Sequence, residues 1–542
     1  MMELQYALRF YKKKHFVLFV LIFLNFVKIV IGLYTPLLYS VVIDKIILKH
    51  TNEVYRLLIV LCIFQLLGIG IVYILKTTES KLTREINYSV KERIANSVLS
   101  VPFYKMSQYT KGRIQVLLTS DTVAPANFIM NILNAIFHIG VIIGVAITMY
   151  SISWEMTCIV MVMYPIILFI NRIYNKKIHN TAVYLSEKND LLVGIARKIS
   201  GQLSDIKIQN GKEKILKQYC DIARVNKIAN NKYLLYTIQN SSIISFLSYI
   251  NYIFLMMSGA FLVLNGEMGL GDMIAFNTYS KTLSSSLDLV IQLKTNLQSS
   301  LVSISRLREM EIMYEEWNKE DCQKEKLQGE IKNISFKNVF FSYNSHEVLA
   351  DFNMNFYSGI VGIKGKNGCG KTTLLKLIIN ELEIQKGEIH IGKLKIKDIE
   401  ISSLKERISY VGADKFVYGL SIRDNLLLFS NNNKFEEKRI KEVLELLNVY
   451  DEFRALPNQL ETIVEDECNL SSGQIQKLQL ARAILKKPDI FLFDEAFSNL
   501  DIETKNKVLA YIKKECGEKI IILISHNQED YSVCDYIIEL CD

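Results

Sequence analysis

The stretch Gly365-Lys-Asn-Gly-Cys-Gly-Lys-Thr372 has the residue types and the spacing that bind a phosphate group. It fits the pattern G-x-x-x-x-G-K-[ST] and lies between a strand-like apolar run and a helical run. Glycines let backbone N–H groups face one point, and the positive end of the following helix adds to them. Lys371 can then reach the β- and γ-phosphates of ATP, and Thr372 can bind Mg²⁺. The residues predicted to contact the nucleotide here are Gly365, Asn367, Gly368, Cys369, Gly370, Lys371, Thr372 and Thr373.

Two acids end the apolar run IFLFDE, about 120 residues further along the chain. Asp494 is placed to hold Mg²⁺ through a water molecule, and Glu495 is placed to polarise the water that attacks the γ-phosphate. Strands often end in acids, so this run alone is weak evidence. Together with the phosphate-binding loop it predicts an ATP-hydrolysing site.

Four further motifs resemble those of the ATP-binding cassette (ABC) transporters. LSSGQ, residues 470–474, resembles the family's signature, with Ser472 where the family usually has glycine. SNLD, ending at Asp501, resembles the D-loop, and ISHN places His526 at the switch histidine, which contacts the γ-phosphate. VFFSYN places Tyr343 where the family stacks an aromatic ring on adenine. The order and spacing of these motifs make the resemblance specific.

The resemblance implies a dimer in which each ATP lies between the phosphate-binding loop of one subunit and the signature of the other. Lys371, Glu495 and His526 would be the catalytic residues. Ser471 and Gly473 would face the γ-phosphate bound by the partner. Because one chain carries a nearly complete set of motifs, a homodimer is expected, with a heterodimer as the alternative. The signature residues predicted to contact nucleotide are Ser471, Ser472, Gly473 and Gln474.

One position departs from the family pattern. The segment RISYVGADKFVYGLSIRDN aligns with the family's Q-loop, and Ala413 occupies the position of the glutamine. That glutamine normally contacts Mg²⁺ and relays to the membrane domain, and an alanine side chain has no group that can do either. Tolerated drift is one interpretation. Slowed or loosely coupled hydrolysis is the other.

The first 300 residues contain the elements that a bilayer requires. Spans of about 20 apolar residues cross the roughly 30 Å of hydrocarbon in a membrane. The long connections after the second and fourth spans are rich in Lys and Arg and have helical periodicity, so they are expected in the cytoplasm as helical hairpins, together with the N-terminus and the C-terminal half. The six candidate spans centre on residues 16–43, 57–75, 128–150, 156–170, 243–264 and 273–293, and the last of them is the least apolar.

These features predict a multi-domain chain in the cell membrane. The expected fold is an all-α six-helix transmembrane domain, residues 1–312, a polar linker, 313–330, and an α/β P-loop ATPase domain of the ABC type, 331–542. KGRIQVLLTSD and ISGQLSDIKIQNGKE resemble the cytoplasmic loops of six-span, type IV ABC exporters. The resemblance covers nearly the whole chain and implies a half-transporter.

The amino-acid composition limits the class of protein and the partners that this chain can have. Half of the residues are hydrophobic and 22% are charged, which fits a chain that is part membrane and part globular. The net charge is +8, but no basic cluster alternates with aromatics, so no nucleic-acid partner is expected. The nine cysteines have no metal-ligand spacing, and reduced thiols are expected.

Polar residues inside the spans bear on the nature of the cargo. Polar residues inside the spans either line a water-filled cavity or bond between helices, and a Lys-lined cavity would favour an anionic cargo. No domain precedes the first span, so the cysteine-peptidase domain of some peptide exporters is expected to be absent. A modified peptide is the expected cargo, with lipid, lipopeptide or drug as alternatives, and an ATP-switched sensor without transport as the alternative of another class. The polar span residues are Lys28, Asn251, Lys281, Ser284, Ser285, Ser286 and Asp288.

Overall fold

The chain folds into two compact units. The structure is a computed structural model that describes residues 2–540, except 107–108, 344–345, 367, 413–415, 429–436, 465–469, 499 and 517. The membrane unit comprises Met1–Lys91 and Thr119–Arg306, and the nucleotide unit comprises Glu92–Leu118 and Leu307–Asp542. The end of the first long connection, residues 92–118, therefore groups with the C-terminal half.

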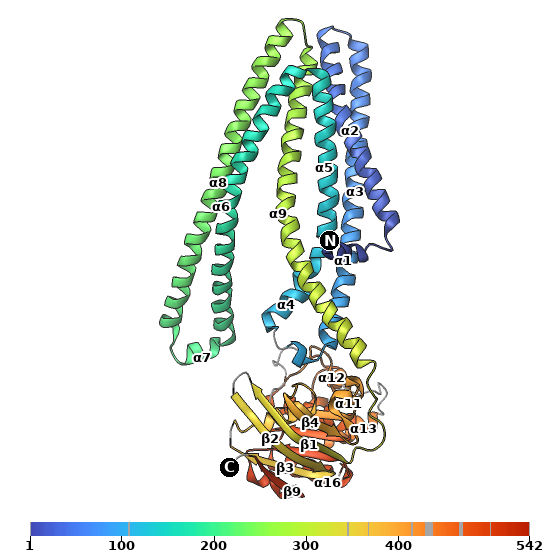
Figure 1. The fold of residues 1–542 in the computed structure, drawn as a ribbon, viewed down its shortest axis with the longest axis vertical. Helices are drawn as coiled ribbons and strands as arrows, with labels where there is room; N and C mark the ends of the chain where they lie inside the picture. Colours follow the sequence, from blue (N-terminus) through green and yellow to red (C-terminus); the bar gives the residue numbers. More distant parts are fainter. Residues whose placement is uncertain are drawn as a thin grey trace. The chain divides into compact units, whose positions relative to one another are not determined.

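The membrane unit consists of long helices formed by the apolar runs (Figure 1). Among the described residues, α2, α3, α6, α8 and the stretch Lys111–Ile152, which contains α5, are long and apolar enough to cross a membrane. The sixth predicted span forms the first part of α9, which does not reach this apolar composition, so it stays a prediction. The helices are α1 (Met2–Arg9), α2 (His15–Ile47), α3 (Thr51–Ser100), α4 (Lys111–Thr119), α5 (Ala124–Ile152), α6 (Trp154–Gly201), α7 (Leu203–Ile208), α8 (Lys212–Leu264) and α9 (Leu270–Asp321).

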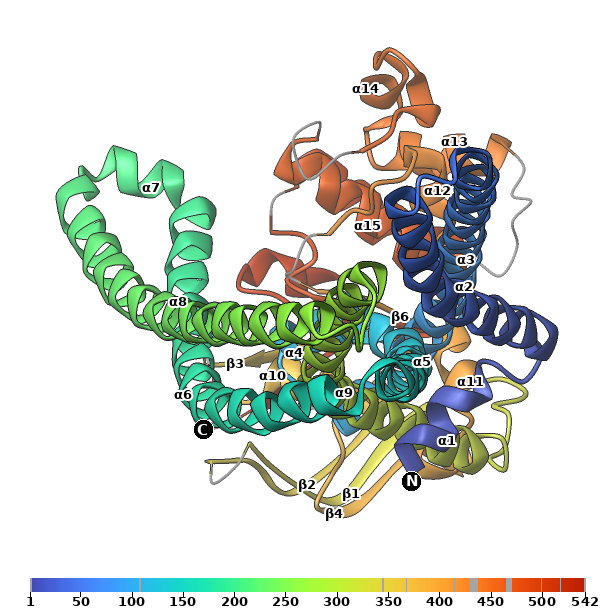
Figure 2. The same ribbon diagram turned by 90° about the horizontal axis from the view of Figure 1, so that it is seen from above.

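The two long connections are continuations of membrane helices, as their periodicity predicts. Helices α6 and α8 have 48 and 53 residues, so each is about 70–80 Å long at ~1.5 Å per residue. They lie side by side and are joined by the short α7 (Figures 1 and 2). Helix α3 likewise continues to Ser100. Since hydrocarbon takes up only ~30 Å, much of each helix must lie in water.

The start of α9 is held against the end of α2. The Gly271 N–H donates to Asp44 Oδ1 at 3.0 Å, and Ser40 Oγ donates to Asp272 Oδ1 at 2.7 Å. The Asp44 carboxylate therefore caps a helix that begins 226 residues later in the chain, at Leu270. A side chain at Gly271 would meet the Ser40 carbonyl oxygen at 2.1 Å, so only glycine fits at this contact.

The nucleotide unit contains the predicted α/β domain. A five-stranded parallel sheet has the order β6-β7-β8-β3-β9, and a four-stranded antiparallel sheet has the order β2-β1-β4-β5. Strands β7 and β8 are buried along their whole length, as expected for central strands of a parallel sheet covered on both faces. The strands are β1 (Asn333–Tyr343), β2 (His346–Tyr357), β3 (Gly359–Gly365), β4 (Lys386–Ile391), β5 (Leu394–Lys395), β6 (Ile408–Val411), β7 (Ile490–Asp494), β8 (Ile520–Ile524) and β9 (Tyr536–Leu540).

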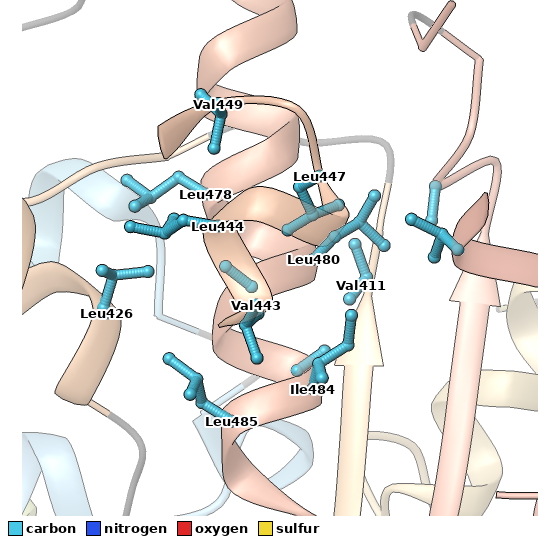
Figure 3. Packing of buried hydrophobic residues seen from close by; sticks show 14 of the residues in the cluster. Val411, Leu426, Val443, Leu444, Leu447, Val449, Leu478, Leu480, Ile484 and Leu485 are labelled. Carbon is cyan, nitrogen blue, oxygen red and sulfur yellow. The ribbon is translucent and has the colours of Figure 1, made fainter. Parts of the chain in front are cut away.

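Helices complete this unit and form a core around α15 (Figure 3). Leu478 and Ile484 of α15 pack with Val443 and Leu444 of α13 and with Val411 of β6. This core joins the helical part of the unit to the parallel sheet. The helices are α10 (Lys371–Ile378), α11 (Ile401–Arg407), α12 (Ile422–Leu427), α13 (Glu437–Leu446), α14 (Tyr450–Arg454), α15 (Ser472–Lys486) and α16 (Ile502–Cys516).

Ion pairs and an apolar cluster that includes Met106 and Met310 connect residues 92–118 to the last part of α9. Arg93 lies 2.8 Å from buried Glu311, and Lys105 lies 2.7 Å from Glu320, both on the last part of α9. Arg113 lies 3.5 Å from Glu309. The predicted linker, 313–330, is thus helical up to Asp321, where α9 ends.

Candidate nucleotide-binding site

The phosphate-binding loop connects β3 to α10, as the sequence predicts. Gly368 and Gly370 have φ angles of +85° and +93°, which favour glycine. A side chain at Gly365 would meet the Leu540 carbonyl oxygen at 2.5 Å, and one at Gly370 would meet Val348 at 2.8 Å. The glycines therefore keep side chains out of the loop. Asn367 lies outside the described residues.

Lys371 is the first residue of α10, and its side chain turns back over the loop. Its Nζ donates to the carbonyl oxygens of Gly365 at 2.7 Å and Lys366 at 2.9 Å. Lys371 and Thr373 are buried, and Cys369 is half-buried with Sγ 3.9 Å from the Lys371 Nζ. The Lys371 ammonium group thus lies over the loop, where the sequence pattern predicts a cation that contacts the phosphates.

Asp494 ends β7 next to this loop. Its Oδ2 accepts a hydrogen bond from the Tyr410 hydroxyl at 3.3 Å, and its side chain is buried. Burial raises the pKa of the Asp494 carboxyl, while hydrogen bonds from Thr372 and Tyr410 lower it in part. The contact between Thr372 and Asp494 brings together the two predicted Mg²⁺ ligands. Hydroxyl and carboxylate oxygens are the donors that Mg²⁺ prefers, so these residues fit the ion.

Glu495 and His526 form a pair, with Glu495 Oε1 2.7 Å from His526 Nε2. Glu495 has a φ of +56°, a left-handed conformation that is costly for any residue except glycine. Its N–H donates to the Ile524 carbonyl oxygen at 2.9 Å, which continues the β7–β8 pairing by one bond. The two predicted catalytic side chains thus meet beyond the carboxyl ends of adjacent strands.

A cleft of about 770 Å³ adjoins these residues. Thr372, Asp494 and Glu495 line it on the side of the phosphate-binding loop. Tyr410 also lines it, as does Phe103 from the segment between α3 and α4. The predicted Q-loop residue Ala413 lies outside the described residues, shortly after the lining residue Gly412.

The signature begins α15 and makes its hydrogen bonds within the chain. Ser471 is the N-cap, and its side chain accepts from the Gln474 N–H at 3.2 Å. The Gln474 side chain accepts in turn from the Ser471 N–H at 2.8 Å, which completes a capping box. Ser472 and Gly473 form the first turn of the helix. This is a rigid helix N-terminus that can receive an anion.

The remaining predicted nucleotide contacts lie at the ends of other elements. Tyr343 ends β1, is exposed, and makes a T-shaped ring contact with Phe341. Asp501 precedes α16, and its side chain accepts from the Thr504 N–H at 2.8 Å as a helix cap. This bond holds the Asp501 side chain against the start of α16.

Comparison with protein families agrees with this geometry. The family model described as "ABC transporter" matches residues 349–498, and the one described as "ABC transporter transmembrane region" matches residues 18–287. The two matches together cover most of the chain. The chain belongs to the ABC transporters. It is a half-transporter of this family, with one membrane part and one nucleotide-binding part fused in that order.

Individual relatives of this ABC transporter cover different shares of it. The transport/processing ATP-binding protein ComA of Streptococcus pneumoniae is 31% identical over 49% of the chain and 37% of its own length. The lactococcin-G-processing and transport ATP-binding protein LagD of Lactococcus lactis is 32% identical over 52% of the chain and 40% of its own length. The chain thus matches well under half of these two relatives.

Other relatives match nearly end to end. The putative export ATP-binding/permease protein RP696 of Rickettsia prowazekii is 26% identical over 98% of the chain and 92% of its own length. The structure of a bacterial Atm1-family ABC exporter with ATP bound has a TM-score of 0.80 and covers 97% of the chain, at 17% identity. The match includes 93% of the exporter's own chain. This similarity shows that the two proteins share a fold.

Two residues that the sequence motifs do not include hold the backbone beside Glu495 and His526. Gln476 Nε2 donates to the Ala496 carbonyl oxygen at 2.7 Å, which secures the backbone next to strained Glu495. The Tyr531 hydroxyl accepts from the Ser525 N–H at 3.1 Å, directly before His526. Gln476 lies two residues after the signature, so its position in the sequence could have identified it as a candidate. Tyr531 has no motif that would identify it.

The polar residues of the transporter's spans differ in how far they are buried. Asn251 and Ser286 are buried, as expected for side chains that pack between helices. Lys281 and Ser285 are exposed in the single chain, and Ser284 and Asp288 are half-buried. Lys28 lines a small cavity of about 40 Å³ with Asn25, Lys76, Glu79 and Asn134. That volume suits a water molecule and is too small for a cargo.

Proposed function

We propose that this chain is an ATP hydrolase that drives export across the cell membrane. The observation that carries the proposal is the 2.7 Å pair of Glu495 and His526, next to Asp494 and a phosphate-binding loop. A carboxylate held by a histidine is suited to accept a proton from an attacking water. RP696 is named a putative export protein and ComA a transport/processing protein, and both names support export.

The proposed roles follow from where each group lies. Lys371 would exchange its two carbonyl contacts for phosphate oxygens, since a buried ammonium group gains from an anionic partner. Glu495 would hold the attacking water and accept its proton, and His526 would orient Glu495. Mg²⁺, when bound by Thr372 and Asp494, would neutralise charge on the phosphates.

We infer that the working form is a homodimer in the cell membrane. The signature of one copy would complete the nucleotide site of the other, because its α15 N-terminus is already capped and ordered. The Lys- and Arg-rich connections support a cytoplasmic location for the N-terminus, both long loops and the nucleotide unit. A heterodimer with a related chain is the alternative. Mixing two differently tagged copies and measuring co-purification tests this proposal.

A peptide is the proposed cargo. The support is the name of LagD, a lactococcin-G-processing and transport protein, and that of ComA. Exposed Lys281 on α9 would favour a carboxylate on the cargo if it faces the transport path. Lipids, lipopeptides and drugs are the alternatives.

Inside-out vesicles test export directly. ATP should drive accumulation of the cargo, and a Glu495→Gln vesicle should accumulate none. The probes are a labelled peptide pool, a fluorescent lipid and a cationic dye, so that the same assay separates the cargo classes. ATP hydrolysis with no uptake of any probe, together with nucleotide-dependent capture of a membrane partner, would instead support an ATP-switched sensor.

The position of Ala413 gives a second test. We expect Ala413→Gln to raise the ATPase rate a few-fold, or to raise the amount of cargo moved per ATP, because it restores the amide that the family uses at this position. The measurement is ATP turnover and uptake in the same vesicles. An unchanged rate and an unchanged ratio would mean that the alanine is tolerated drift.

A further inference from the structure

A closed ring of polar contacts lies beside the signature. Lys477 Nζ donates to the Asn448 carbonyl oxygen at 3.1 Å and lies 3.9 Å from Asp501 Oδ1. Asp501 Oδ2 accepts from the Thr504 N–H at 2.8 Å, and Thr504 Oγ1 accepts from Asn448 Nδ2 at 3.0 Å. These four residues, called the Lys477 ring below, join the end of α13, the signature helix α15 and the start of α16.

A branch connects this ring to the signature itself. Glu452 of α14 has one carboxylate oxygen 3.6 Å from Lys477 Nζ, and its other oxygen accepts from Gln474 Nε2 at 2.7 Å. Gln474 and Lys477 are three residues apart on α15, so they lie on the same face of the helix. Gln474 also forms the capping box with Ser471. An unbroken chain of polar contacts therefore runs from Asp501 to Ser471.

The surroundings of Lys477 restrict its movement. Its side chain is only 12% exposed, and an ammonium group at this depth needs its anionic and carbonyl partners. The next residue, Leu478, packs into the core with Leu444 (Figure 3), which fixes the rotation of α15. Asn448, two residues after the end of α13, has a φ of +48°, the left-handed conformation typical of the residue that follows a helix. Each member is thus held by its own element as well as by the ring.

We propose that Lys477 is a positioning residue that holds the signature and the D-loop Asp501 as one rigid surface, ready for the nucleotide site of a second copy. This inference rests on the proposed function, in which the signature faces the partner. Lys477 touches neither the phosphate-binding loop nor Glu495 in the contacts described above. Its loss should therefore misplace the signature without weakening the first binding of ATP.

The test compares three substitutions in the full-length protein. Lys477→Met keeps the apolar stem and removes the charge, Lys477→Arg keeps the charge, and Lys507→Met is the control. Lys507 contacts Asn448 Oδ1 at 3.4 Å and Glu503 at 2.7 Å, but it lies outside the ring and is exposed. Steady-state turnover gives kcat and KM, and a fluorescent ATP analogue gives the affinity of the phosphate-binding loop.

We expect Lys477→Met to lower kcat by roughly tenfold to a hundredfold, the range that misplaced groups around a reaction centre cause. The analogue should bind with an affinity within about twofold of the native value. Lys477→Arg should retain most of the turnover, and Lys507→Met should match the native protein. A native kcat in Lys477→Met, or equal losses in the methionine and arginine variants, would overturn the proposal.

Amide hydrogen exchange, measured on the nucleotide-free protein, tests the Lys477 ring independently of the proposed ATPase function. Residues 471–475 and 501–507 should both exchange faster in Lys477→Met, and neither should change in Lys507→Met. Unchanged exchange in Lys477→Met would show that the ring does not hold these segments. Absence of ATP hydrolysis in the native protein would reject the proposed function, and the exchange result would still decide the ring.

Discussion

Replacing Glu495 by Gln should stop ATP turnover and leave the protein dimeric with ATP bound. The amide has nearly the same shape as the carboxylate but cannot accept a proton from water, and general bases contribute roughly 10²–10⁴-fold to such reactions. ATP binding should be preserved, because Lys371 and Asp494 are unchanged. The measurements are steady-state phosphate release, and the molecular mass of the purified protein with and without ATP.

Glu503→Gln is a matched control for this substitution. Glu503 lies on the first turn of α16, its side chain is 73% exposed, and it pairs with Lys507 at the surface. An exposed pair of this kind contributes little, so the control should hydrolyse ATP at the native rate. Native turnover in Glu495→Gln would contradict the assignment of the general base and, with it, the proposed ATPase mechanism.

Much of the candidate nucleotide site can be predicted from the sequence, because its motifs are formed by residues close together in the chain. The spacing of Gly365, Lys371 and Thr372 within eight residues already fixes a strand–loop–helix unit, and the structure contains it as β3, the loop and α10. Asp494 and Glu495 are likewise predictable, since Asp494 ends a buried parallel strand and Glu495 follows it directly. The role of His526 is predicted only from the resemblance to the ABC transporters, because no local pattern marks this histidine.

Contacts between distant segments account for what the sequence does not predict. Tyr410 and Asp494 are 84 residues apart, and they meet only because β6 and β7 pair in parallel. The left-handed φ of Glu495 accompanies the hydrogen bond from its N–H to Ile524 of β8. A glutamate in the sequence does not indicate a left-handed conformation, as a glycine would. The grouping of 92–118 with the nucleotide unit depends on ion pairs with α9, more than 190 residues away. Periodicity alone cannot pair one helix with another.

Replacing Gly271 by Ala should destabilise the membrane unit. The added Cβ would lie 2.1 Å from the Ser40 carbonyl oxygen and 2.9 Å from the Ser40 Cα. Both are backbone atoms of α2, so no rotamer change can relieve the clash, and the two helices must separate. Overpacking of this kind costs about 1–3 kcal/mol, and the Gly271 N–H would also move away from the Asp44 carboxylate that caps α9. The measurement is thermal unfolding of the detergent-purified protein.

Gly32→Ala is the control, and its expected effect has the opposite sign. Gly32 lies on α2, the same helix as Ser40, and among the described residues no atom beyond its chain neighbours and the nearby α2 backbone lies within 4 Å of a Cβ placed there. Alanine is favoured over glycine inside a helix by up to about 1 kcal/mol, so this variant should unfold at the native temperature or slightly above it. A lowered unfolding temperature for Gly271→Ala alone would show that α2 and α9 touch through their backbones. Equal temperatures for both variants would mean that Asp44 and Ser40 hold α9 at a distance that leaves room for a methyl group.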